Sequence, residues 1–218
     1  MGIKAGGDKM KTPWMEMSVR EFQSALASSS PTPGGGTAAA ISLGQAAALT
    51  IMVCDLTIGK EKWESGWDIA NKALPICVKI MSRAGELADL DSDAFDDVMA
   101  AYRMPKGDEK EVNMRKESIK KSSIVATNVP FETSKLALEI LEILPEIALK
   151  GNGNAVSDVG VAGLLASAAC KGALFNVDIN LSGLSDDVAT EIRRESPEIL
   201  KMSRALSRQI MDNVRERL

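Results

Sequence analysis

Two segments of the chain place glycine and asparagine residues directly before a long uncharged stretch. Pro33-Gly34-Gly35-Gly36-Thr37 precedes one stretch, and Gly151-Asn152-Gly153-Asn154 precedes the other. If each stretch is a helix, its first turn offers unpaired backbone N–H groups and partial positive charge, and glycines let a ligand approach the backbone closely. Such a start could hold a carboxylate, a carbonyl oxygen or an oxyanion. The alternative is a flexible connection with an ordinary cap, although three successive glycines are costly in backbone entropy.

An acidic cluster is the second feature with chemical potential, and it consists of Asp91, Asp93, Asp96 and Asp97. On a helix Asp93 shares a face with Asp96 and Asp97, whereas Asp91 could be the N-cap. Capping and solvated charge explain most clusters of this kind. The spacing does not fit a calcium loop, because no glycine and no distal glutamate follow in register.

Histidine is absent from the sequence, and this absence restricts the chemistry. It excludes Ser-His-Asp and Cys-His nucleophile systems and the usual histidine-ligated zinc site. Acid–base work must therefore come from Asp, Glu, Lys, Cys or the single Tyr102. The three cysteines, Cys54, Cys77 and Cys170, lie singly in apolar stretches, which favours reduced thiols in a cytoplasmic protein over a metal site.

Composition indicates a single helical domain. The chain has 218 residues, 45% of them hydrophobic and only 4% aromatic, and alanine, leucine, isoleucine and methionine are plentiful, which favours helices over strands. The net charge is -4 and no basic block is present, so we do not expect nucleic-acid binding. We expect an all-α, single-domain bundle of long helices, with an N-terminal tail at 1–17 and the helical domain at 18–218.

The order of helices follows from caps and breakers. A capping box at Ser18–Glu21 predicts a first helix to about residue 28. Two small-residue central helices are predicted, over 37–54 and over 159–173 with a cap at Ser157-Asp158. The other predicted elements are a helix at 67–89 with a kink or break at Pro75, a helix starting at 91–95 and ending at 104–108, a helical region at 109–150, a loop at 176–183 and a charged helix at 185–217.

The uncharged run at 37–54 is long enough to span a membrane. Thr37, Ser42, Gln45 and Thr50 interrupt it, and most of its residues are small rather than leucine or isoleucine. We therefore expect a central helix packed closely on its neighbours, and no membrane association.

The sequence resembles the formiminotetrahydrofolate cyclodeaminase and methenyltetrahydrofolate cyclohydrolase family. The resemblance covers about residues 18–187. It rests on Phe22-Gln23-Ser24-Ala25-Leu26-Ala27-Ser28, Pro31-Thr32-Pro33-Gly34-Gly35-Gly36-Thr37-Ala38-Ala39, Leu56-Thr57-Ile58-Gly59-Lys60, Asp93-Ala94-Phe95, Met104-Pro105, Val129-Pro130, Gly153-Asn154, Ser157-Asp158, Asn176-Val177 and Ile179-Asn180. Thr37 stands where serine is common in the family.

The resemblance implies an all-α fold, a homodimer, a folate bound in a cleft and an essential acidic residue. Asp93 is the residue predicted for that role, because it falls in the Asp-Ala-Phe segment. No metal and no cofactor besides the tetrahydrofolate substrate is expected. The predicted substrate-binding residues are Gly34, Gly35, Gly36, Thr37, Asn152, Asn154, Asp158 and Asn180.

The expected reaction is hydrolysis of the methenyl bridge. The methenyl substrate is a delocalised cation, so an ionised Asp93 could stabilise it and take a proton from water. The glycine-rich helix starts suit the pterin carbonyl or the glutamate tail, and we expect them to lie apart from the cationic bridge. A chain of this length resembles free-standing cyclohydrolases, which favours hydrolysis over loss of ammonia from a formimino group. A non-catalytic helical binding or scaffold protein is the alternative from another class.

Overall fold

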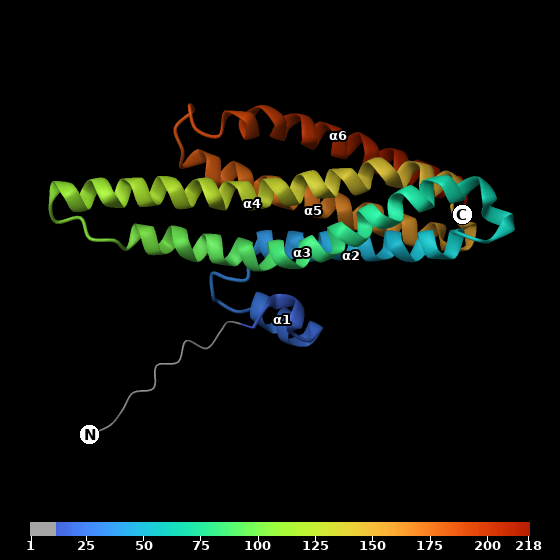
Figure 1. Cartoon of the computed structure of the whole chain (residues 1–218), viewed down its shortest axis with the longest axis horizontal. Helices are drawn as coiled ribbons and strands as arrows, with labels where there is room; N and C mark the ends of the chain where they lie inside the picture. The colour runs from blue at the N-terminus through green and yellow to red at the C-terminus, as the bar shows by residue number, and fades with distance from the viewer. Residues whose placement is uncertain (1–11) are drawn as a thin grey trace, which may run out of the picture.

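The computed structural model describes residues 12–218, which form helices and contain no strand. Five long helices lie side by side in an elongated bundle, and a short one lies outside it (Figure 1). The predicted all-α fold is therefore confirmed. The helices are α1 Val19–Leu26, α2 Gly35–Thr57, α3 Trp67–Tyr102, α4 Glu109–Lys150, α5 Val156–Ser182 and α6 Thr190–Arg215, with short 3-10 helices η1 Trp14–Glu16, η2 Glu61–Gly66 and η3 Gly153–Ala155.

Helices α2 and α5 form the centre of the bundle, as their small residues predict. Each packs against the other and against α4, and α2 also packs along α3 while α5 packs along α6. Gly44 faces the Ala84 side chain and Gly172 faces that of Ala39, so the helix axes can approach closely. By length and composition α2 and the stretch Gly153–Ser182 could each cross a membrane, but 56% of each apolar window is buried in the bundle, as in core helices.

Helix α1 is joined to the bundle through the segment before it. Ser18 and Glu21 form the predicted capping box, with the Ser18 N–H donating to Glu21 Oε2 at 2.8 Å. No residue of α1 is buried, whereas Trp14 is 7% exposed and packs in a small cluster that includes Leu87 and Val129. Trp14 thus belongs to the folded domain although it falls within the predicted tail. Residues 1–11 of that tail lie outside the described part of the chain.

The predicted break between residues 89 and 91 is wrong, because α3 is continuous from Trp67 to Tyr102 and runs through Pro75. Leu87, Ala88 and Ser92 are buried at helical spacing, so packing continues across the acidic cluster and outweighs the weak helix preference of aspartate. Asp91 consequently lies inside a helix and is not an N-cap.

The predicted loop at 176–183 is also wrong, since α5 continues to Ser182. Val177 and Leu181 are buried on the core face, and the Asn180 side chain donates to the Ala126 carbonyl of α4 at 2.7 Å. The helix begins at Val156, so Asp158 lies in its first turn and does not cap it. Helix α4 has the predicted bounds, and the last helix begins a few residues later than predicted.

Candidate functional site

A cavity of about 230 Å³ lies where the glycine-rich turn meets α3, α4 and α5. Asp91 is the only charged side chain among the residues that line it. The lining residues are Pro31, Thr32, Gly34, Gly35, Gly36, Asp91, Phe95, Val98, Ala126, Asn176 and Asn180. A lone carboxylate in a wall of glycine, amide and apolar groups is the chemical signature of this site.

The start of α2 lies against the Asp91 carboxyl group. A Cβ atom at position 36 would lie 2.6 Å from Asp91 Cγ and 2.7 Å from Oδ2, so any larger residue there would have to displace the carboxyl group. Gly34 is the N-cap of α2 and provides no side-chain cap. The positive end of the α2 dipole therefore faces a carboxylate, which is the favourable sign.

Thr37 binds the carboxyl group of Asp91 directly, since its Oγ1 donates to Asp91 Oδ2 at 3.0 Å. Burial raises the pKa of Asp91 above its ordinary value of 3.8, and the hydrogen bonds from Thr37 counteract part of that increase. A half-buried carboxylate with a raised pKa is a stronger base than a solvated aspartate.

A second layer of hydrogen bonds lies behind Thr37. Thr37 Oγ1 is 3.1 Å from Ser92 Oγ, and the Trp14 indole Nε1 donates to Ser92 Oγ at 3.0 Å. Trp14 is further held by its backbone N–H, which donates to Asp89 Oδ1 at 2.9 Å. Thr37 and Ser92 are fully buried.

Two asparagines of α5 complete the polar wall. Asn180 Nδ2 donates to the Ala126 carbonyl at 2.7 Å, and Asn176 Nδ2 donates to the Gly172 carbonyl at 2.9 Å. These bonds orient both amides and leave their oxygens as acceptors for a ligand with N–H groups, such as the edge of a heterocycle.

The structure brings together five of the predicted substrate-binding residues. Gly34, Gly35, Gly36 and Asn180 line the cavity, and Thr37 binds its carboxylate. The helix start and the acidic residue were expected to lie apart, whereas the fold places both in one cavity. The carboxylate offsets the positive helix end, which removes the objection to binding a cation there.

Asp93, the predicted acid, is exposed and does not line the cavity. At ~100° per residue it points roughly 200° away from Asp91 around α3. Asp91 was not predicted as a site residue because its position in the acidic cluster resembles a helix cap, whereas it lies inside α3. Its four-residue spacing from the core residue Leu87 was the signal that it faces inward.

Asn152, Asn154 and Asp158 lie at the other end of α2, about 35 Å away at ~1.5 Å per residue. Asn152 donates through Nδ2 to the Leu56 carbonyl at 2.7 Å and through its backbone N–H to Thr57 Oγ1 at 3.0 Å. Asn152 Oδ1 in turn accepts from the Asn154 backbone N–H at 2.9 Å. These contacts join helix ends, and within one chain this region does not meet the cavity.

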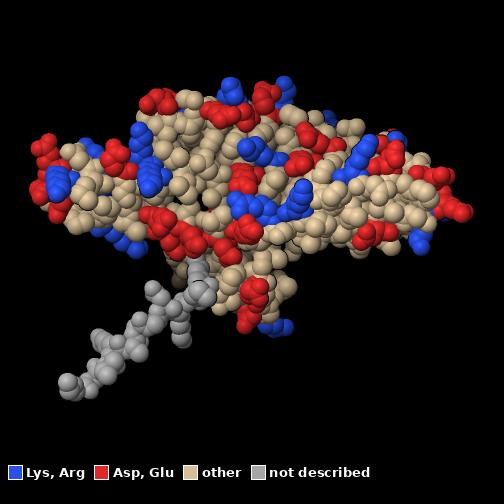
Figure 2. Space-filling model, in the orientation of Figure 1, with Lys and Arg blue, Asp and Glu red and all other residues tan. Residues whose placement is uncertain are grey.

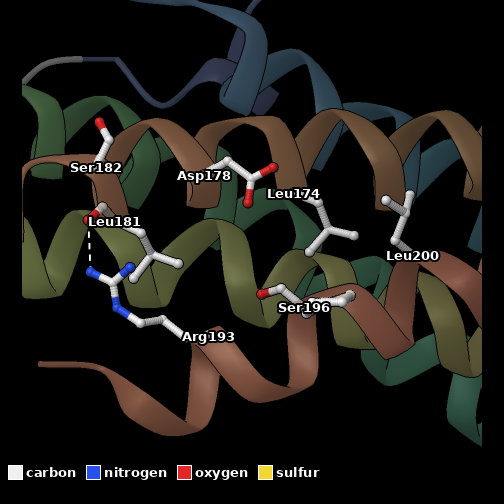
Figure 3. Close-up of a pocket in the computed structure, with 8 residues that line it drawn as sticks. Leu174, Asp178, Leu181, Ser182, Arg193, Ser196 and Leu200 are labelled. Atoms are coloured by element: carbon white, nitrogen blue, oxygen red, sulfur yellow. Dashed lines mark hydrogen bonds between the residues drawn. The ribbon is translucent and has the colours of Figure 1, made fainter. Parts of the chain in front are cut away.

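A larger hollow of about 460 Å³ lies between α5 and α6, and leucines line it together with the charged residues Asp178 and Arg193 (Figure 3). Its one cationic lining residue, Arg193, donates through Nη2 to the carbonyls of Leu181 and Leu184, both at 2.8 Å. Arg193 therefore holds the end of α5, and Asp178 is the other charged residue of this lining.

Metal-ligating groups do not cluster in the described part of the chain. Among residues 12–218 no group of three or more His, Cys, Asp or Glu side chains is placed to hold a metal ion. On the face seen in Figure 2, acidic and basic side chains are interspersed. Burial raises the pKa of the three cysteine thiols, to about 11 for Cys54 and Cys170 and about 12 for Cys77, so none is an activated nucleophile.

Comparison with known proteins places these features in a family. Residues 18–198 match the family described as formiminotransferase-cyclodeaminase. The chain is 39% identical to the methenyltetrahydrofolate cyclohydrolase of Methylorubrum extorquens, over 92% of this chain and 97% of that one. It is 32% identical to the formimidoyltransferase-cyclodeaminase of Dictyostelium discoideum, over 94% of this chain but 37% of that protein.

The fold agrees with these matches. The crystal structure of formiminotetrahydrofolate cyclodeaminase from Thermotoga maritima superposes with a TM-score of 0.76 at 27% identity, over 94% of this chain and 96% of that one. The chain therefore belongs to the formiminotransferase-cyclodeaminase family.

Proposed function

We propose that this protein is a methenyltetrahydrofolate cyclohydrolase, which adds water to the methenyl bridge and yields formyltetrahydrofolate. The observation that carries the proposal is Asp91, the only charged side chain in the cavity lining, held at the start of α2. The match to a cyclohydrolase along nearly its whole length supports the same reaction.

The proposed reaction uses Asp91 as an electrostatic partner and as a base. The bridge carbon carries positive charge shared with its two nitrogens, so a neighbouring carboxylate stabilises the bound cation. Water attacks that carbon, its oxygen forms the new C–O bond, and Asp91 takes one water proton. The resulting carbinolamine loses one C–N bond, Asp91 returns its proton to the departing nitrogen, and the hydroxyl proton leaves to solvent as the formyl group forms.

The remaining lining groups suit the heterocycle. The amide oxygens of Asn176 and Asn180 can accept from ring N–H groups, and the N–H groups at the start of α2 can donate to a ring carbonyl. At about 230 Å³ the cavity is smaller than the ~300 Å³ lower range of ligand pockets. It therefore fits the ring end of a folate, while the rest of the molecule extends along the surface. No further cofactor and no metal is part of the proposal.

Loss of ammonia from a formimino group is the second candidate, favoured by the structural likeness to a cyclodeaminase. Both reactions pass through a tetrahedral carbon between the same two nitrogens, so Asp91 could serve either. The test supplies methenyl and formimino tetrahydrofolate separately and follows near-ultraviolet absorbance and ammonia. We expect methenyl hydrolysis to be faster. Faster ammonia release would assign the deaminase activity, and activity on neither would favour a non-catalytic role.

The proposal includes a soluble cytoplasmic homodimer that binds neither membranes nor nucleic acid. Dimerisation is supported by a stripe of apolar side chains on the outer face of α5. In this stripe Phe175 is 67% and Ile179 is 69% exposed, and they lie in line with exposed Val161 and Leu164. Contiguous apolar surface of this kind is typical of an association site. Sedimentation at micromolar concentration tests the dimer, and a monomer of 23.2 kDa would contradict it.

A further inference from the structure

The hydrogen-bonded row behind Asp91 has a direction that follows from its donors. The row runs from Trp14 Nε1 to Ser92 Oγ, then to Thr37 Oγ1, then to Asp91 Oδ2, with separations of 3.0, 3.1 and 3.0 Å. An indole N–H can only donate, and each hydroxyl has a single proton. When the Thr37 hydroxyl donates its hydrogen bond to Asp91, the Ser92 hydroxyl must donate to Thr37 Oγ1 and accept from the Trp14 indole.

Reversal of the row is obstructed at its buried end. If Asp91 were protonated on Oδ2, it would donate to Thr37, and Thr37 would donate to Ser92. Ser92 would then accept from both Thr37 and Trp14, and its own proton would have to leave the row from a fully buried site. A buried polar hydrogen without its partner is unfavourable. Trp14 therefore disfavours protonation of Asp91 at Oδ2.

The other carboxylate oxygen faces the glycines. Oδ1 is the Asp91 atom nearest to the position that a Cβ of residue 36 would occupy, beside the start of α2. The glycine turn is part of the cavity wall. The two oxygens of one carboxylate thus have different surroundings, because Oδ2 accepts from Thr37 Oγ1 and Oδ1 lies nearest the glycines of the cavity wall.

We propose that Trp14, Ser92 and Thr37 are positioning residues that keep Asp91 Oδ2 as a hydrogen-bond acceptor, so that the proton taken from water is carried on Oδ1. This inference rests on the proposed function and adds to it a residue that lies before the family match, which begins at residue 18. Only Asp91 touches the reacting atoms. Trp14 acts through Ser92, and Ser92 acts through Thr37.

The pH dependence of turnover depends on few groups. The cavity walls from α2, α4 and α5 contain no titratable lining residue, and Asp91 is the only one from α3. The acidic limb of the pH profile of kcat/KM therefore reports Asp91 in the free enzyme. Loss of a donor to the carboxylate weakens its ionised form and moves that limb to higher pH.

The experiment compares the pH profile of kcat/KM of the full-length variants W14F, S92A and T37V with that of the parent protein. W14F keeps an aromatic ring and removes only the N–H. T37V removes the direct donor to Asp91. We expect about a tenfold loss in kcat/KM at neutral pH and the largest shift of the acidic limb to higher pH. The reason is that hydrogen bonds to charged groups are stronger than those between neutral groups. S92A and W14F should shift the limb in the same direction by less, and T37S should restore the parent profile.

A double variant and a tryptophan far from the cavity provide the controls. In the double variant W14F/S92A the limb should shift no further than in S92A alone, because both changes interrupt one row. W67F is the matched control, since Trp67 Nε1 donates to the Thr57 carbonyl at 2.9 Å near the far end of α2. It loses an equivalent indole hydrogen bond and should leave the pH profile unchanged.

A direct titration separates this inference from the proposed function. The 13C carboxyl resonance of Asp91, assigned by its absence in D91N, reports the titration without substrate. An upward shift of that midpoint in W14F and S92A but not in W67F supports the row. An unchanged midpoint in S92A and T37V, or additive shifts in the double variant, overturns it. A parent enzyme inactive on methenyltetrahydrofolate overturns the proposed reaction instead, and the titration still decides the row.

Discussion

Gly36 and Asp91 lie so close together that a Cβ atom at position 36 would be 2.6 Å from Asp91 Cγ. They are more than fifty positions apart in the sequence, on α2 and α3. The glycine at this position is thus explained by the carboxylate facing it, and the contact joins the positive start of one helix to the buried charge of another.

Gly36→Ala should displace the carboxylate and reduce turnover about tenfold or more, because misplacement by 1 Å can cost ~100-fold in rate. Gly44→Ala, on the same helix but outside the cavity lining, is the matched control. A Cβ there would lie 3.5 Å from Ala84 Cβ, an ordinary contact, so its activity should stay within a few-fold of the parent. Kinetics with methenyltetrahydrofolate, alongside thermal unfolding, distinguishes the two. Equal effects would show that proximity to Asp91 is not the reason for the glycine.

Asp91→Asn should lower kcat by about two orders of magnitude or more, the scale of a lost general base, with folding intact. The sequence assigned this role to Asp93, whose exposed position outside the cavity lining transfers the expectation to Asp91. Asp93→Asn carries the same chemical change two residues away and should retain most activity. The opposite ranking would restore the original assignment.

The comparison of these two aspartates shows what the sequence could predict. Caps, breakers and uncharged runs determined the helices well, because each depends on a few neighbouring residues. Which aspartate faces the cavity depends on whether α3 is interrupted, and the acidic cluster resembles a helix start as closely as a helix interior. Packing of Leu87 and Ser92 against other elements decides the matter, and that information is not local.

The same limit applies to the two glycine-rich helix starts. They look alike in sequence, yet one faces a cavity and the other contacts the end of α2 through Asn152. Local residue types indicate that backbone N–H groups are available at a helix start. They do not indicate whether a ligand or another part of the chain occupies them.

Asn152→Ala should therefore affect stability and not catalysis. The variant loses the bond to the Leu56 carbonyl and the cap on the Asn154 N–H, which together are worth about 1–2 kcal/mol of unfolding free energy. Chemical denaturation measures that loss, and kcat/KM per folded enzyme should match the parent. A raised KM with unchanged stability would instead return this segment to the substrate site.

Ile179→Lys should weaken the proposed dimer, because it places a charge in the apolar stripe on α5, at its most exposed residue. Val78→Lys is the control, as Val78 is 47% exposed but lies on α3, outside the stripe. Sedimentation velocity over a range of concentrations should show dissociation in the first variant only. If both variants remain dimeric, the α5 stripe is not the contact surface.

The burial of Asp91 predicts how the free energy of unfolding changes with pH. Burial raises its pKa in the folded protein, so over the interval between its ordinary value of 3.8 and the raised value the folded state binds more protons than the unfolded state. Stability then falls as pH rises through that interval, and at neutral pH the ionised, half-buried carboxylate is a net cost to folding.

Asp91→Asn keeps the shape and removes the charge. It should raise the free energy of unfolding at neutral pH, and the gain should disappear below the ordinary titration range of aspartate. Urea denaturation of parent and variant, at neutral pH and below the titration range of aspartate, measures the difference in unfolding free energy. Asp93→Asn is the matched control. A variant that is less stable than the parent at neutral pH would show that the Thr37 hydrogen bonds outweigh the desolvation of the carboxylate.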